Sequence, residues 1–313
     1  MKILFRILSI AIVTAFSFTV NAQDIKVLIV DGQNNHNWAA MTPFMKKQLE
    51  QTGRYKVSIS TAPARFRAPR NLPKEKRAAA EKAARELTAK DWAKWRPTFA
   101  DFNIVISNYN GEDWPKQVKT AFERYISTGG RFICIHAANN SFPNWLEYNK
   151  MIGLGGWGGR TEKHGPYVYY NESNQLVRNT DKGRGGSHGP QHEFIIQIRN
   201  SKHPITAGMP TKWKHAKDEL YDSLRGPGTN MEILATAWSP KSKRHEPMMM
   251  VLEYGKGKIF HTPMGHENGQ SLQCIGFITT LDRACEWLAT GQVTTKIPPN
   301  FPTANKVSMV TKK

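Results

Sequence analysis

Four apolar, strand-like runs in the first half of the chain alternate with amphipathic segments, and this alternation limits the fold more than any other feature. The runs are IKVLIVDG (25–32), YKVSISTAP (55–63), FNIVISNYN (102–110) and RFICIHAA (131–138). Helices are expected at 38–51 and 115–130, the second beginning at Pro115 and ending at Gly129 and Gly130. Strands that are apolar on both faces and alternate with helices predict an α/β fold with a doubly wound, mainly parallel sheet of the flavodoxin-like kind.

The second half of the chain has a different pattern and predicts β-rich additions to that sheet. Its strand-like runs end in MMMVLEYGKGKIFHTPMGH, in which 255–257 is expected to form a hairpin turn. A last amphipathic helix is predicted over 271–291. The glycine-rich KGRGGSHGP (182–190) lacks the GK[ST] ending of a phosphate loop, so we predict a flexible surface loop and expect no nucleotide cofactor. One α/β domain is therefore expected over 23–293, followed by a C-terminal tail over 294–313.

The first 22 residues are typical of a signal peptide. Lys2 and Arg6 precede a largely apolar run from residue 7 to 20, and small residues follow up to Ala22. The run is shorter than the ~20 residues that a membrane span needs. We therefore predict cleavage after Ala22 and a periplasmic or secreted protein. Three cysteines are too few for a disulfide framework, so packing must stabilise the domain.

The excess of positive charge is concentrated in one insertion. The chain has 44 Lys and Arg against 25 Asp and Glu, and the stretch 54–96 alone has 13 basic and 4 acidic side chains. Residues 64–97 are predicted to form a basic helical insertion, because KEKRAAAEKAAREL pairs opposite charges at helical spacing. A solvated helix is the simpler explanation; the alternative is a patch over 65–96 that binds an anionic envelope surface or an acidic glycan. No nucleic-acid-binding signature is present, so no nucleic-acid partner is expected.

Polar side chains follow the ends of the predicted strands. Ligands of open parallel sheets bind outside the carboxyl ends of the strands. Three of these ends carry histidines. The polar residues at the strand ends are Asp31, Asn35, His36, Asn108, His136, Asn139, His261, His266 and Glu267. His136 is a candidate metal ligand, general base or hydrogen-bond donor. Cys134 lies inside the strand between two isoleucines and is predicted to be core rather than a nucleophile.

The order of several motifs resembles that of the trehalose-utilisation, or ThuA-like, family, whose fold is related to class I glutamine amidotransferases. The matching pieces are KVLIVDGQNNHNW, RFICIHAANNSF, HPITAGMP, DELYDSL and GKGKIFHTPMGHE, from about residue 25 to 290. The family lacks the amidotransferase cysteine, in agreement with the interpretation of Cys134. The resemblance points to His36, His136, Glu219, Tyr221, His266 and Glu267 as site residues, and implies chemistry on disaccharides oxidised to 3-keto glycosides.

Three functional hypotheses follow. The first is an exported lyase or hydrolase of glycosides or 3-keto glycosides. Its expected catalytic residues are His136, Glu219, Tyr221 and Glu267, with a divalent metal, preferably zinc, at His36, His136 and His266. Asp31, Asn35, Asn108 and Asn139 are expected to contact the saccharide, with Trp38, Trp114 and Trp157 as candidate stacking platforms. The second hypothesis is a non-catalytic saccharide-binding or accessory protein of the envelope. The third is an envelope interaction protein that acts through the basic insertion.

Overall fold

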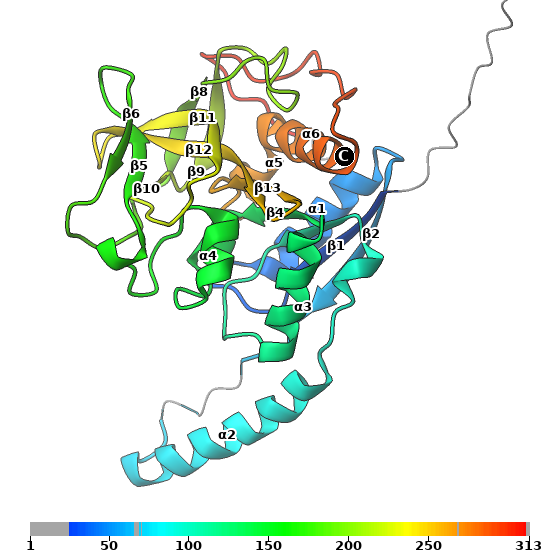
Figure 1. Ribbon diagram of the computed structural model, residues 1–313, viewed down its shortest axis with the longest axis vertical. Coiled ribbons are helices and arrows are strands. Elements are labelled where there is room, and N and C mark those ends of the chain that lie inside the picture. Colours follow the sequence, from blue (N-terminus) through cyan, green and yellow to red (C-terminus); the bar gives the residue numbers. More distant parts are fainter. Residues whose placement is uncertain (1–24, 66–68, 70, 268, 311–313) are drawn as a thin grey trace, which may run out of the picture.

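A large mixed sheet forms the centre of the molecule (Figure 1). The computed structural model describes residues 25–65, 69, 71–267 and 269–310, so the predicted signal peptide lies outside the described residues. In the 11-stranded sheet, nine strands follow the order β2-β1-β3-β4-β13-β12-β11-β8-β9, and β5 and β6 extend it from β12. The α/β class and the β-rich second half are therefore confirmed.

The first five strands of that order are parallel, and the next four are antiparallel. The parallel strands are β2 (Tyr55–Thr61), β1 (Ile25–Asp31), β3 (Ile104–Ser107), β4 (Arg131–Ile135) and β13 (Gly257–Thr262). The antiparallel extension consists of β12 (Arg244–Tyr254), β11 (Met231–Ser239), β8 (His192–Ile198) and β9 (Lys212–Asp218). The edge pair is β5 (Tyr167–Tyr170) and β6 (Leu176–Asn179), and a separate small ladder joins β7 (Ser187–His188) to β10 (Tyr221–Asp222).

Helices cover both faces of the parallel strands. Alternate residues of β1 belong to opposite cores: Val27 and Ile29 pack in one, Leu28 and Val30 in the other. Helices α1 (Trp38–Glu50) and α6 (Ile275–Thr290) contribute to the first core, and α3 (Lys116–Ser127) and α4 (Leu146–Ile152) to the second. This two-sided burial explains why β1, β3 and β4 are nearly continuous apolar runs, whereas the edge strand β2 alternates with polar residues that are exposed.

Two predicted elements differ from the expectation. The fourth strand stops at Ile135, and a 3₁₀ turn (His136–Asn140) follows it. The last helix is broken at Cys274 into α5 (Gln270–Gln273) and α6, because the backbone at Cys274 pairs with Met309 in the following segment. The predicted tail thus packs on the domain, and its Phe301 is buried against Trp213.

The basic insertion forms helix α2 (Lys74–Lys94), which extends away from the rest of the molecule (Figure 1). Ala84 is its one buried residue within the described part of the chain. Trp92 contacts Trp95, which in turn contacts the core residue Trp114, so aromatic rings join the end of α2 to the domain. The rest of α2 is open to solvent, as the expectation of a solvated helix requires. Within the described ranges, no helix is long and apolar enough to cross a membrane.

Replacing Gly276 with Ala is expected to destabilise the fold by about 1–3 kcal/mol, although alanine favours helices. A Cβ at this position of α6 would lie 2.4 Å from the indole ring of Trp213, which is fully buried. Urea unfolding measures the effect. The control is Gly189→Ala, where a Cβ has nothing within 4 Å. A Gly276→Ala protein as stable as the wild type would contradict this account of the packing.

Glu246 makes stability depend on pH. Burial raises the pKa of this β12 carboxyl to about 7, and the negative charge of Asp222 adds to the rise, against a hydrogen bond from Ser242. This pKa exceeds that of an unfolded Glu, which is about 4.3. Glu246 therefore contributes its full stabilisation below about pH 4.3, and the folded state loses this contribution as pH rises through 7. Glu246→Gln should therefore gain stability over the wild type between pH 5 and pH 8 in urea unfolding. The exposed Glu253→Gln is the control, and a constant difference between the two pH values would refute the expectation.

Candidate metal centre

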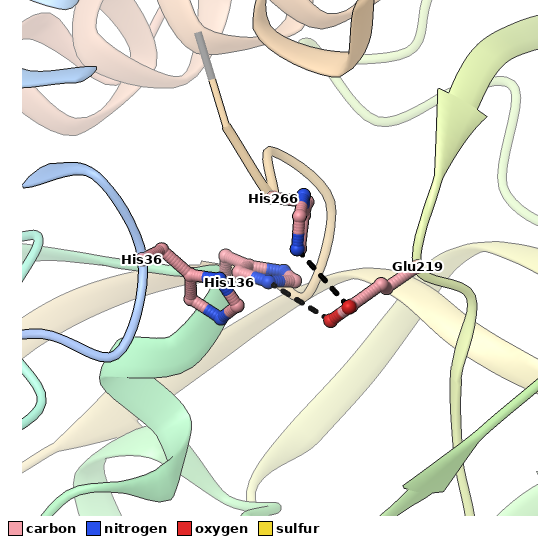
Figure 2. Close-up of side chains that lie close together, drawn as sticks. All are labelled: His36, His136, Glu219 and His266. Carbon is pink, nitrogen blue, oxygen red and sulfur yellow. Dashed lines mark ion pairs between the residues drawn. The ribbon is translucent and has the colours of Figure 1, made fainter. Parts of the chain in front are cut away.

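Four side chains from distant parts of the sequence meet beside the sheet (Figure 2). His36 follows β1, His136 follows β4, Glu219 follows β9 and His266 lies beyond β13. One ligand atom from each lies within 4.8 Å of the others. The carboxyl ends of neighbouring parallel strands share one edge, which explains why His36, His136 and His266 lie together.

The Glu219 carboxylate lies between two of the imidazoles. Its Oε1 is 3.0 Å from Nε2 of His266, and its Oε2 is 3.7 Å from Nε2 of His136. The ring of His36 completes the group, with centroids 4.7 Å from His136 and 4.5 Å from His266. Three imidazoles and one carboxylate at these separations match the ligand types of a divalent transition-metal site.

The backbone and one carbonyl fix the orientation of His136. Its φ of 47° is unusual for a residue other than glycine, and it turns the chain sharply from β4 into the 3₁₀ turn. Nδ1 lies 2.7 Å from the carbonyl oxygen of Pro263, which can only accept, so Nδ1 carries the proton. Nε2 is then left with a lone pair, and the Tyr221 hydroxyl donates to it at 3.0 Å. Imidazoles that bind metals commonly donate their other N–H in this way.

Burial sets the protonation states of the cluster. Burial and the neighbouring His136 and His266 lower the pKa of His36 to about 3, and burial lowers the pKa of His136 as well. Burial alone would raise the pKa of Glu219, but the hydrogen bond from His266 and the nearby His136 bring it to about 2. The pKa of His266 is raised, because Glu219 outweighs the effect of burial. At neutral pH the cluster offers neutral imidazoles at His36 and His136 and an ionised carboxylate at Glu219, whereas His266 must lose a proton before it can bind a metal.

The buried carboxylate of Asp218 joins two of the candidate ligands. Its Oδ1 accepts from the backbone N–H of Glu219 at 2.7 Å and of His266 at 3.2 Å. Its Oδ2 accepts from the N–H of Gly265 at 2.8 Å and from Nε2 of His215 at 2.9 Å. A single side chain therefore holds the end of β9 against the turn after β13.

A cavity of about 400 Å³ opens beside the cluster. Its wall combines amides, hydroxyls and aromatic rings with two members of the cluster, His36 and Glu219. The lining residues are Asn35, His36, Asn110, Gly111, Asn140, Ser141, Phe142, Pro143, Trp157, Gly158, His188, Glu219 and Tyr221. Pockets of this size suit small organic ligands. Neutral hydrogen-bonding groups beside flat rings favour a ligand rich in hydroxyl groups with apolar ring faces.

A buried arginine holds one wall of the cavity. Arg160 donates to the carbonyl oxygens of Asn140, Gly156 and Ser141 and to Oδ1 of Asn149, at 2.7–3.2 Å. No carboxylate among the described residues pairs with it, and burial lowers its pKa to about 10. The rigid fork of the guanidinium thus fixes the loop that carries Asn140 and Ser141.

Sequence reasoning missed His188 and Arg160. The loop 182–190 was predicted to be flexible, but β7 pairs with β10, and the N–H groups of Trp157 and Gly186 bond to Gly185 and Ser223. This pairing brings Nε2 of His188 to 3.9 Å from Oε1 of Glu219. The glycines of this loop were the available signal that it packs closely against the domain. Gly186 has a φ of 86°, and its Cα packs against Gly156 and Trp157.

The other predicted site residues lie in different places. Asn35 and Trp157 line the cavity, and Trp38 lines a neighbouring one. Glu267 is exposed, 4.0 Å from Nδ1 of His266. Asp31, Asn108 and Asn139 are buried in the fold, where Asn108 bonds to Asn34 and Thr42 and Asn139 to His261. This placement argues against direct substrate contact by these three side chains.

Two further expectations concern core residues. Trp114 is not a stacking platform, because it is buried among Phe99, Phe122 and Phe142. The interpretation of Cys134 as core is confirmed: it is fully buried, and burial raises the pKa of its thiol.

Comparison with known proteins identifies the family. The sequence model of ThuA, described as trehalose utilisation, matches residues 26–288. The chain belongs to the ThuA family. A putative ThuA-like protein from Parabacteroides merdae ATCC 43184 is 39% identical, with a TM-score of 0.81 over 92% of this chain and 98% of that one. A second putative ThuA-like protein, from Bacteroides uniformis ATCC 8492, is 18% identical and shares the fold. Its TM-score is 0.53 over 86% of this chain and 94% of that one. No curated protein matches the chain.

In this ThuA-family chain, Asp218→Asn is expected to destabilise the fold by about 3–5 kcal/mol. The amide has one acceptor oxygen instead of two, and its NH₂ group would face N–H donors at 2.7–3.2 Å. Thermal and urea unfolding measure the loss. The control is Asp113→Asn, whose carboxylate is exposed and pairs with Lys119. A loss no larger than that of the control would show that Asp218 does not hold the two segments.

Proposed function

We propose that this protein is an exported carbohydrate-processing enzyme that acts on glycosides or 3-keto glycosides, with a divalent metal held by His36, His136, Glu219 and His266. The observation that carries the proposal is the convergence of these four side chains beside a cavity lined with amides and aromatic rings. The family's description as trehalose utilisation supports a saccharide as the ligand. The strand order β2-β1-β3-β4-β13, with helices on both faces, supports a doubly wound, flavodoxin-like core that binds ligands at this edge.

The four residues fit a metal ion chemically. Nε2 of His136 has a lone pair, which a metal would take in place of the hydrogen bond from Tyr221, and Glu219 is ionised beside it. A bound divalent ion would polarise a carbonyl oxygen of the substrate. Imidazole suits zinc, copper, iron and nickel, so zinc remains a prediction.

We assign proton transfer to residues other than the four proposed metal ligands. The C–H bond next to a 3-keto group is acidic, so a base that removes the C2 proton allows the aglycone to leave by β-elimination. An imidazole whose free lone pair binds a metal cannot act as this base, and a metal-bound carboxylate is a weaker base than a free one. His188 and Tyr221 line the cavity outside the four ligands, and we assign proton abstraction to the His188 imidazole and proton donation to the Tyr221 hydroxyl. Glu267 is less suited, since it is exposed and does not line the cavity.

Metal binding tests the first half of the proposal. Elemental analysis of the purified protein, and calorimetric titration of chelator-treated protein with Zn²⁺, Mn²⁺ and Ni²⁺, should show one ion per chain. His36→Ala, His266→Ala and Glu219→Gln should each weaken binding by at least about 100-fold, since loss of an outer partner alone typically costs 10–100-fold. His192→Ala is the control, because His192 begins β8 outside the cluster. Equal affinities in all variants would exclude this centre.

Turnover tests the second half. The wild-type protein is incubated with 3-keto glycosides and their parent glycosides, before and after chelation and with metal restored. We expect turnover that is lost on chelation and recovered with metal, and that falls in His188→Ala. Absence of turnover in every condition would remove the enzymatic assignment. If saccharides still bind, with affinities that alanine at His136 and His266 leaves intact, the protein is a non-catalytic saccharide-binding protein that uses the same cavity.

Export and the basic insertion complete the proposal. The sequence of residues 1–22 supports cleavage after Ala22, which mass spectrometry of the mature N-terminus would detect. The solvent exposure of α2 and the excess of basic residues in 65–96 support contact with an anionic envelope surface. Such binding should weaken with salt and disappear when 65–96 is deleted.

A further inference from the structure

A second cavity adjoins the one beside the cluster. We call the first the cluster cavity and the second the side cavity. The side cavity has a volume of about 380 Å³, and Trp38, Arg65 and the loop 32–35 line it. Asn35, Asn110 and Gly111 line both cavities, so the two meet at a shared rim. At this rim the Asn110 amide donates to Oδ1 of Asn35 at 2.6 Å.

Trp38 differs from the other tryptophans of the chain. Its ring is half-buried and, among the described residues, is the one indole with no aromatic or cationic partner. It is the first residue of α1, and the Asn37 side chain caps that helix, so the ring is attached to a fixed element. The part of the ring that stays exposed faces no other ring or cation among the described residues, and a ligand in the side cavity would cover it.

The charges of the side cavity favour a neutral ligand. Arg65 is the one basic side chain among the described residues that line it, and its guanidinium lies 3.8 Å from the carboxylate of Glu112. The Gln33 and Asn34 amides are already bonded to neighbouring loops, which makes that wall rigid. A flat indole beside paired charges and amide edges suits the apolar face of a neutral sugar ring better than an anion.

We infer that the side cavity is a second sugar subsite, so that the protein binds a neutral glycoside of at least two rings across the Asn35–Asn110 rim. The reacting ring occupies the cluster cavity near Trp157, and the second ring stacks on Trp38. This inference rests on the proposed function, since it takes saccharides as the ligands. It adds the place of the second ring and identifies Trp38 as the residue that recognises it.

The rim also links recognition to the cluster. Asn35 accepts from Asn110, and its own Nδ2 lies 2.9 Å from Nε2 of His36. On the other side, the Ser141 hydroxyl lies 3.4 Å from Oδ1 of Asn110. A glycosidic oxygen that crosses this rim would lie close to amide groups that can donate to it, next to a candidate metal ligand.

Calorimetric binding of paired probes tests the subsite. The probes are neutral disaccharides, trehalose among them, and the monosaccharides that compose them. In Trp38→Ala, affinity for the disaccharides should fall about tenfold, to near that of the monosaccharides, while monosaccharide affinity stays unchanged. Trp38→Phe, which keeps a ring, should recover part of the loss. Trp157→Ala should weaken both classes, and Trp238→Ala, an exposed indole on β11 outside both cavities, should weaken neither.

The outcomes separate this inference from the proposed function. If disaccharide affinity in Trp38→Ala equals that of the wild type, or if both probe classes weaken equally, the second subsite is overturned while saccharide binding stands. If the wild-type protein binds no saccharide of either class, the proposed function is overturned and the subsite with it. Metal affinity should be the same in Trp38→Ala and the wild type, which confirms that the substitution leaves the cluster intact.

Discussion

The geometry of the whole site depends on the Asp218 carboxylate. Parallel strands bring His36, His136 and His266 to one edge, but Glu219 comes from β9, at the far end of the sheet order. Asp218 joins the end of β9 to the turn after β13. Its two oxygens accept hydrogen bonds from the backbone N–H groups of Glu219 on one segment and of Gly265 and His266 on the other. A buried carboxylate without donors would be strongly unfavourable, so the donors stabilise the charge while the charge holds the segments together.

Three of the six described residues other than glycine that have a positive φ lie around the cavity. The φ values are 47° at His136, 52° at Phe142 and 53° at Trp157. Residues other than glycine rarely adopt these positive values. Such conformations persist where the surroundings leave no alternative. Here Pro263 fixes the ring of His136, the aromatic core fixes Phe142, and Gly185 bonds to the backbone of Trp157. The sharp turn after β4 directs an imidazole into the site, while Cys134, two residues earlier, packs in the core.

Local patterns in the sequence predicted what local forces determine. The four parallel runs and the histidines at their ends were found because apolar periodicity and strand direction are local properties. The break at Cys274 was missed because it depends on pairing with Met309, and the roles of Arg160 and His188 were missed because they depend on contacts between loops. The family resemblance identified Glu219, which follows an antiparallel strand that the parallel-sheet argument does not cover.

The dispersal of the cluster along the chain affects how the protein reaches its native state. Residues 36, 136, 219 and 266 meet only when β1, β4, β13 and β9 have taken their places in the fold. Contacts between residues so distant in sequence form slowly, because long loops must close before they are stabilised. Nascent or truncated chains therefore contain the individual side chains without the cluster, and the complete site is a marker of finished folding.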